Sequence, residues 1–303
     1  MRERHIRVAR TARYYTLGSA GTHLREVWLV CHGYRQLAGR FLPRFADLDD
    51  GTRLIVAPEG LSRFYLHDPA GGHGKEVPIG ATWMTREDRE NEITDYVGFL
   101  DGVLDEVLDE VLDEVSEESG GAVPRLTVLG FSQGAHTVCR WVAAGDTDVT
   151  RIILWGAYLP EDFDLDRGPE QLGSAELILV RGLLDHFISD EAHASQEKRL
   201  EELGIPFKTI THPGDHEIDP ALLRQIAGPQ HVCVSAGPGS RRSQSGLDLG
   251  RGRGVAGAQE RLDLQLFFFE ANRVGDVQWV LNHIHSGEVI PLMQDGRDLG
   301  RVQ

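Results

Sequence analysis

The sequence predicts an α/β protein with a mostly parallel, doubly wound sheet. Short apolar segments rich in β-branched residues alternate with longer helix-like segments through residues 2–227. Parallel strands buried on both faces read as continuous apolar runs, and their alternation with helices implies right-handed crossovers. We expect strands at residues 26–31, 53–57, 125–129, 151–155, 176–180 and 206–211, with one or two edge strands within residues 5–17.

Helices are expected between these strands. Thr85 followed by Asp88 has the spacing of a capping box, which predicts a helix over residues 86–118. Sites in doubly wound sheets lie beyond the carboxyl ends of the strands, so the loop after each strand is where functional residues are sought. Further helices are expected at residues 133–144, 190–203 and 217–227.

Composition and charge exclude several classes of protein. The 303 residues are 41% hydrophobic, and no apolar stretch approaches the roughly 18 residues expected of a membrane span. Residues 1–10 are charged and lack the apolar core of a secretory signal, and the three cysteines show no metal-type spacing. The net charge of −16 disfavours nucleic acid as a partner. We expect a cytoplasmic protein without a transmembrane segment.

Two segments have unusual compositions. Residues 103–114 repeat the unit Val-Leu-Asp-Glu three times, which predicts a helix with an apolar stripe and an acidic face. Residues 228–258 are rich in Gly, Ser, Arg and Pro, as linkers are, and residues 259–303 have strand-like runs but little length for a core. We expect an α/β domain at residues 1–227, then a linker and a short, poorly ordered extension. A protein partner would dock on the acidic helix or this extension.

The most informative motif is Gly130-Phe131-Ser132-Gln133-Gly134, which reads G-x-S-x-G between a predicted strand and a predicted helix. A sharp turn at this junction exposes the serine hydroxyl, and it needs small residues two positions before and after the serine. The pattern predicts that Ser132 is a nucleophile.

A serine nucleophile needs a histidine base and a carboxylate that orients the imidazole. Asp185 lies just past the strand at residues 176–180, and the next strand is followed by two histidines, His212 and His216. We prefer His216, because it lies in a glycine-containing loop directly before a helix, whereas His212 abuts the strand. The alternatives are His186 and His193 for the base, and Asp164, Asp166 or Asp190 for the acid, with Asp190 positioned as a helix N-cap.

Acyl transfer also requires donors for the developing oxyanion. The backbone N–H of Gln133, directly after the nucleophile, is the first predicted donor, and that of Tyr34, in the loop after the strand at residues 26–31, is the second. Gly33 permits the close turn. Residues 61–92 carry many aromatic side chains after another strand, and we predict that they line the substrate site, chiefly through Phe64, Tyr65, Trp83 and Met84.

Five blocks together resemble the phospholipase/carboxylesterase family of α/β hydrolases, which includes acyl-protein thioesterases. They are His32-Gly33, Pro58-Glu59-Gly60, residues 130–134, residues 182–185 and Gly214-Asp215-His216. The resemblance covers residues 26–227. It implies an α/β-hydrolase fold without a large cap domain, a triad of Ser132, Asp185 and His216, and Tyr34 and Gln133 as oxyanion donors.

The resemblance also implies a substrate class, the carboxylic esters, extending to acyl thioesters or lysophospholipids. One departure bears on the substrate: many members continue His-Gly with a small residue, Gly and Asp, whereas this chain has Tyr34-Arg35-Gln36. We expect no metal or other cofactor, because the histidine spacings come without further ligands. The rival hypotheses are a binding or scaffold protein with an idle triad, and a peptidase on the same fold.

Overall fold

The computed structural model of the chain describes residues 1–66, 77–114, 124–145 and 147–228. The chain divides into two compact units, of which the larger comprises Met1–Phe64 and Ile79–Val234. Of the second unit, only residues 65, 66, 77 and 78 are among those described. The predicted linker and C-terminal extension lie outside the described residues.

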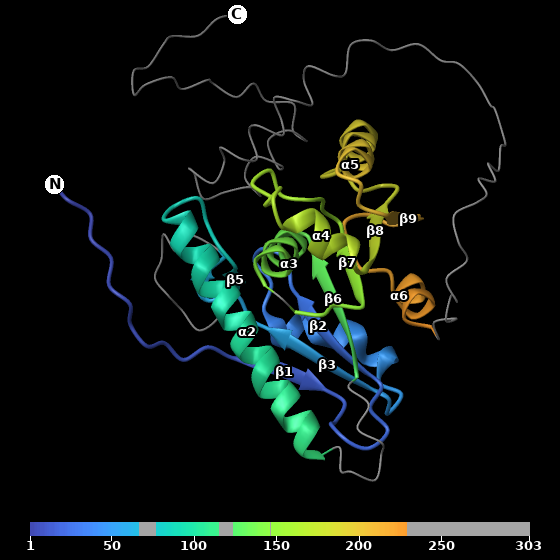
Figure 1. The fold of residues 1–303 in the computed structure, drawn as a ribbon, viewed down its shortest axis with the longest axis horizontal. Helices are drawn as coiled ribbons and strands as arrows, with labels where there is room; N and C mark the ends of the chain where they lie inside the picture. The colour runs from blue at the N-terminus through green and yellow to red at the C-terminus, as the bar shows by residue number, and fades with distance from the viewer. Residues whose placement is uncertain (67–76, 115–123, 146, 229–303) are drawn as a thin grey trace, which may run out of the picture. The chain divides into compact units, whose positions relative to one another are not determined.

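A seven-stranded sheet with the order β1-β3-β2-β6-β7-β8-β9 runs through the larger unit (Figure 1). Strand β1 pairs antiparallel with β3, and every other neighbouring pair is parallel. The predicted mostly parallel sheet is therefore confirmed. The strands are β1 (Tyr14–Leu17), β2 (Glu26–Cys31), β3 (Arg53–Pro58), β6 (Arg125–Phe131), β7 (Arg151–Trp155), β8 (Glu176–Gly182) and β9 (Phe207–His212).

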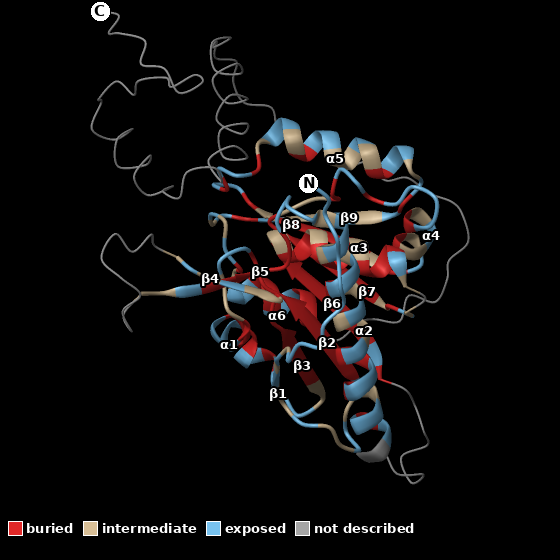
Figure 2. Cartoon of the chain, turned by 90° about the vertical axis from the view of Figure 1, so that its left-hand side faces the viewer, coloured by how far each residue is buried: buried red, intermediate tan, exposed pale blue. Residues whose placement is uncertain are grey.

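Helices cover both faces of this sheet, as Figure 2 shows by the buried strands between them. Alternate strand residues point to opposite faces, so Val27 and Leu29 enter one core cluster while Trp28 and Val30 enter the other. The first cluster includes side chains of α2 (Arg89–Glu114), α3 (Gln133–Ala144), α4 (Gly168–Gly173) and α5 (Asp190–Glu202). The second includes those of α1 (Ala38–Phe41), the 3-10 helix η1 (Leu42–Leu48) and α6 (Pro220–Ala227). Strands β4 (Ser62–Tyr65) and β5 (Ile79–Thr82) form a separate two-stranded sheet.

The predicted start of the long helix was wrong by three residues, because the expected capping box does not form. The Thr85 hydroxyl accepts the N–H of Glu87 at 3.2 Å, and Asp88 has a φ of 50°. A residue in this left-handed conformation cannot continue a right-handed helix. Helix α2 therefore begins at Arg89.

One further N-cap and one further helix start differ from expectation, although α5 begins at Asp190 as predicted. The cap of α5 is Ser189, whose hydroxyl accepts the N–H of Ala192, so the prediction of Asp190 as N-cap was wrong by one position. Helix α6 begins at Pro220 rather than at residue 217, with the Asp219 carboxylate accepting the N–H of Leu222. Proline at the first helical position loses no hydrogen bond, which favours this start.

The Val-Leu-Asp-Glu repeat is a packed helix with a solvated acidic face. Val103, Val107 and Val111 are buried against the sheet, as is Leu104 at 5% exposure, whereas Leu112 is 55% exposed. The 3.6-residue period of the helix explains this difference, because a four-residue repeat drifts around the helix axis. No helix in the described ranges, α2 included, is long and apolar enough to cross a membrane.

The repeat offers a matched pair of substitutions. Leu104→Ala should lower the free energy of unfolding by about 2–4 kcal/mol, since it leaves a cavity in the core. Leu112→Ala, at the same position of the third repeat, should cost no more than about 0.5 kcal/mol, because its side chain already meets water. Urea unfolding followed by circular dichroism measures both. Equal losses would contradict the burial of one face of the repeat.

Candidate active site

Ser132 lies in a strained turn between β6 and α3. Its φ is 53°, a left-handed value that few residues other than glycine adopt, and its N–H donates to the carbonyl of Trp155 at 2.8 Å. A Cβ on Gly130 would lie 2.4 Å from the Cα of Ala135, and one on Gly134 would lie 2.2 Å from the carbonyl oxygen of Cys31. Both positions therefore require glycine, as the G-x-S-x-G pattern predicts.

Asp185 and His216 form a hydrogen-bonded pair at the carboxyl ends of β8 and β9. The Asp185 Oδ2 lies 2.8 Å from the His216 Nδ1, and the other carboxylate oxygen accepts the N–H of Phe187 at 2.9 Å. The Asp185 side chain is 1% exposed and that of His216 is 17% exposed. With its Nδ1 proton directed at the carboxylate, the imidazole leaves Nε2 as a base.

Two aromatic rings hold the His216 imidazole, and one of them belongs to the residue before Ser132. It packs between Phe131 and Phe187, with ring centroids 5.0 and 4.8 Å away, and a Cβ on Gly156 would lie 3.0 Å from its Cε1. Phe131 directly precedes Ser132, so the serine and the imidazole share one edge of the sheet. Within the described residues the Ser132 hydroxyl makes no hydrogen bond; such bonds commonly tighten only when substrate binds.

The alternative bases occupy other surroundings. His212 is the last residue of β9, is buried against the ring of Trp155, and accepts the N–H of Gly214 at its Nδ1. His186 is exposed and lies 3.1 Å from Asp215, and His193 faces Glu197 on α5. Neither of these two pairs with Asp185.

The alternative acids serve local roles. Asp164 accepts the N–H groups of Asp166 and Arg167 in the loop before α4, and Asp190 binds Arg181 at 2.6 Å. Among the described acids, Asp185 is the one that contacts the His216 imidazole. The structure therefore pairs Asp185 with His216, and the assignment of Ser132, Asp185 and His216 as a triad stays a prediction.

The loop after β2 lies directly against the nucleophile. A Cβ on Gly33 would be 3.2 Å from the Cβ of Ser132. The backbone N–H groups of Tyr34 and Gln133, the two predicted oxyanion donors, have no acceptor among the described residues. Unpaired donors beside a nucleophile are what an oxyanion hole requires.

The buried side chain of His32 holds the loop after β2 in place by hydrogen bonds. Its Nε2 accepts the N–H of Gly60 at 3.0 Å, so its Nδ1 carries the proton and donates to the carbonyl of Gly33 at 2.8 Å. Burial lowers the pKa of His32, which keeps the imidazole neutral, as both hydrogen bonds need. The indole N–H of Trp83 donates to the His32 carbonyl at 2.8 Å. The role of His32 in holding this loop by hydrogen bonds was not predicted from the sequence. The only sign of this role in the sequence was the His32-Gly33 pair itself.

The four predicted substrate contacts divide into two pairs. Phe64 is half-buried and stacks on Tyr34 with ring centroids 5.4 Å apart, and Tyr65 is 45% exposed and belongs to the second unit. Trp83 and Met84 are 1% and 9% exposed and pack in the core. Burial leaves these two little surface for a ligand, which differs from the predicted lining. Substrate contact by any of the four stays a prediction.

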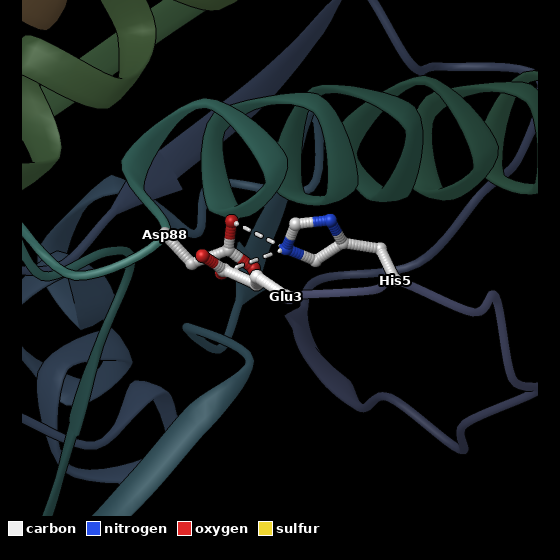
Figure 3. Close-up of side chains that lie close together, drawn as sticks. All are labelled: Glu3, His5 and Asp88. Atoms are coloured by element: carbon white, nitrogen blue, oxygen red, sulfur yellow. Dashed lines mark ion pairs between the residues drawn. The ribbon is translucent and has the colours of Figure 1, made fainter. Parts of the chain in front are cut away.

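One group in the described chain has side chains near enough for a shared metal ion, and it lies outside the triad. His5 Nε2 lies 3.2 Å from Glu3 and 3.3 Å from Asp88 (Figure 3). All three are exposed, and these distances are those of ion pairs between surface groups. The triad and the loop after β2 contain no such group.

The described architecture is that of the α/β hydrolases, which confirms the predicted fold class. A carboxylesterase from Mesorhizobium loti is 19% identical, with a TM-score of 0.52 over 72% of this chain and 95% of its own. SOBER1 from Arabidopsis thaliana is 16% identical, with a TM-score of 0.49 over 67% of this chain and 96% of its own. Acyl-protein thioesterase 2 from Zea mays is 15% identical, with a TM-score of 0.48 over 72% of this chain and 96% of its own. No family model and no curated protein sequence matches the chain.

Gly134 in the turn at Ser132 and Gly98 in α2 give a second matched pair of substitutions. Gly134→Ala places a methyl group against the Cys31 carbonyl and should destabilise the protein by at least about 1–3 kcal/mol. Gly98→Ala, on the exposed side of α2, meets no atom within 4 Å and should stabilise it by about 0.5–1 kcal/mol. Thermal unfolding compares the two. A Gly134→Ala variant as stable as the wild type would contradict the close approach of α3 to β2.

Proposed function

We propose that this chain hydrolyses carboxylic esters through an acyl-enzyme formed on Ser132. The observation that carries the proposal is the 2.8 Å contact between Asp185 and His216, at the sheet edge to which the turn at Ser132 also belongs. Adjacent parallel strands end at one edge, so three loops remote in sequence supply nucleophile, base and acid. The α/β-hydrolase fold of the Mesorhizobium loti carboxylesterase agrees with this assignment.

The proposed reaction assigns each group one step. Ser132 Oγ attacks the ester carbonyl while His216 Nε2 takes its proton, and Asp185 stabilises the imidazolium. The N–H groups of Tyr34 and Gln133 bind the oxyanion, each contributing about 3 kcal/mol of transition-state stabilisation. His216 then gives its proton to the leaving alcohol or thiol. Water attacks the acyl-enzyme by the same sequence of proton transfers and releases the acid.

The substrate class is a small-molecule ester, with acyl thioesters and lysophospholipids as related candidates. Tyr34 and Phe64 offer an aromatic surface beside the proposed oxyanion donors. A ring stacked at this position suits an apolar part of the acyl or alcohol group. A panel of p-nitrophenyl esters, acyl thioesters and peptides decides among these classes, and turnover of peptides alone would favour a peptidase.

The assignment of Ser132 predicts a covalent adduct. A fluorophosphonate probe should label the wild type at one site, because an activated serine attacks phosphorus as it attacks a carbonyl. Ser132→Ala should remove the label, which intact-mass spectrometry measures, and the ester turnover, which the release of p-nitrophenol measures. A folded wild-type protein that takes no label would overturn the enzyme assignment in favour of a binding protein.

The two histidines after β9 make a matched comparison. His216→Ala should lower kcat for p-nitrophenyl butyrate by roughly 10³-fold or more with little loss of stability, since it removes the base. His212→Ala should lower kcat by no more than about tenfold, although the loss of its buried ring will cost stability. The opposite order of effects would show that the base is His212.

A further inference from the structure

Two arginines from different helices share one carboxylate, and one of them lies on α3, the helix that begins directly after Ser132. Arg89 Nη2 lies 2.5 Å from Asp162 Oδ2, and Arg140 reaches the same carboxylate from Nε at 3.2 Å and from Nη2 at 2.8 Å. Arg89 is at the start of α2 and Arg140 is in α3, while Asp162 is in the loop after β7. The three side chains carry a local charge of +1, in a chain whose net charge is −16.

The remaining donors of this cluster converge on a weak acceptor. Nη1 of Arg89 lies 3.8 Å from the Met84 sulfur and Nη1 of Arg140 lies 3.6 Å from it. A thioether accepts hydrogen bonds poorly, so both guanidinium groups keep a donor that a negative oxygen would bind far more strongly. The buried hydroxyl of Tyr96 lies near Arg140 without a well-formed hydrogen bond.

His136 adds a neutral donor to the same cluster. Burial, together with the nearby positive charges of Arg140 and Arg89, lowers its pKa to about 4, and the negative charge of Asp162 opposes this shift. The imidazole is therefore uncharged at neutral pH and makes no hydrogen bond to the described residues. We call Arg89, Arg140, Tyr96 and His136 the cationic cluster.

The cationic cluster is connected to Gln133, one of the proposed oxyanion donors, through α3 and Met84. Gln133, His136 and Arg140 follow one another at helical spacing along the half-buried stripe of α3. The side chain of Gln133 donates to the carbonyl of Met84 at 2.9 Å, and the sulfur of the same methionine meets both arginines. Arg140 is eight residues beyond Ser132, which corresponds to roughly 12 Å along a helix.

We propose that the cationic cluster binds an anionic group, a carboxylate or a phosphate, carried by the ester substrate about 12 Å from the scissile carbonyl, the helical distance from Ser132 to Arg140. The inference rests on the proposed ester hydrolysis at Ser132 and adds the substrate's charge to it. Oxygens of the anion would take the Nη1 donors of Arg89 and Arg140 from the Met84 sulfur. Asp162 would then hold the two guanidinium groups in place. Its negative charge would also lower the affinity of the cationic cluster for the anion.

The test compares esters that differ only in the distal charge. One series contains p-nitrophenyl monoesters of dicarboxylic acids of four to ten carbons, each paired with its methyl-ended isostere. A second places the carboxylate on the alcohol side, in acetyl esters of ω-hydroxy acids. The readout is the ratio of kcat/KM for the charged ester to kcat/KM for its neutral partner. We expect this ratio to peak above one at the longer members of a series.

Variants separate substrate binding from a purely structural role of the ion pair. Arg89→Gln should lower the ratio about tenfold, the range for a charge-assisted hydrogen bond, and Arg89→Lys should restore part of it. Asp162→Asn breaks the same ion pair but removes the competing negative charge, so it should raise the ratio. If the ion pair only stabilised the fold, either variant would change kcat/KM for neutral and charged esters in the same direction.

Arg224→Gln is the control, because it also removes one positive charge from an exposed ion pair, that with Asp47, and should leave the ratio unchanged. If neutral esters are turned over and the ratio of charged to neutral kcat/KM stays near one at every length in both series, the proposed anion binding is wrong. The proposed ester hydrolysis would then still stand. Absence of all turnover together with absence of fluorophosphonate labelling would instead overturn the proposed function. Melting temperatures of each variant verify that the fold is retained.

Discussion

The close packing of α3 against β2 is the constraint on which the candidate site depends. The helix begins within contact of the Cys31 carbonyl, which leaves residue 134 no room for a Cβ, and its first turn lies so close to residue 130 that a Cβ there would meet Ala135. Between these two glycines the chain turns at Ser132 with a positive φ. Such a backbone conformation costs about 1–3 kcal/mol. The hydrogen bond from the Ser132 N–H to Trp155 and the buried strands on either side offset that cost. The same turn lifts the hydroxyl to the sheet edge and directs the N–H of Gln133 to the space beside it.

The rest of the site is assembled by parallel pairing. Asp185 is nearly inaccessible to water, and a buried carboxylate is costly unless it is hydrogen-bonded. The N–H of Phe187 and the Nδ1 of His216 supply two partners, and both lie on loops whose positions follow from the register of β8 with β9. Aromatic rings on both sides fix the imidazole plane. Thus hydrogen bonding selects the tautomer while ring packing selects the orientation.

Sequence patterns predicted the parts of this architecture that depend on local signals. Strands β2 and β7 and helix α3 match their expected bounds, because each combines a clear period with a clear boundary. Helices α1 and η1 were not predicted, since segments this short have no measurable period. The α2 start was misplaced because the Thr85 side chain finds a nearer backbone partner.

Side-chain exposure was the least predictable property. Trp83 was assigned to the substrate site for its aromatic character and its place after a strand, yet it is buried with its indole N–H on the His32 carbonyl. Only the tertiary fold distinguishes an aromatic residue that faces a ligand from one that supports a loop. The cationic cluster escaped sequence analysis for a related reason: its arginines are distant in sequence and meet at Asp162 and Met84, which only the tertiary fold brings to them.

Strand β5 connects the two ends of the proposed substrate site. Arg35, which stands where the family resemblance leads one to expect glycine, adopts a φ of 68°, and its N–H donates to the Ala81 carbonyl while the Ala81 N–H donates to Gln36. The strand therefore holds the loop of Tyr34 in a shape that glycine would otherwise supply. Directly after β5 the chain continues into Trp83 and Met84, which contact His32 and the two arginines. A single short strand thus positions both the loop of the proposed oxyanion donor Tyr34 and the Met84 side chain of the proposed anion site. Under the proposed function, the unusual Tyr-Arg-Gln sequence and the cationic cluster would therefore act on the same substrate.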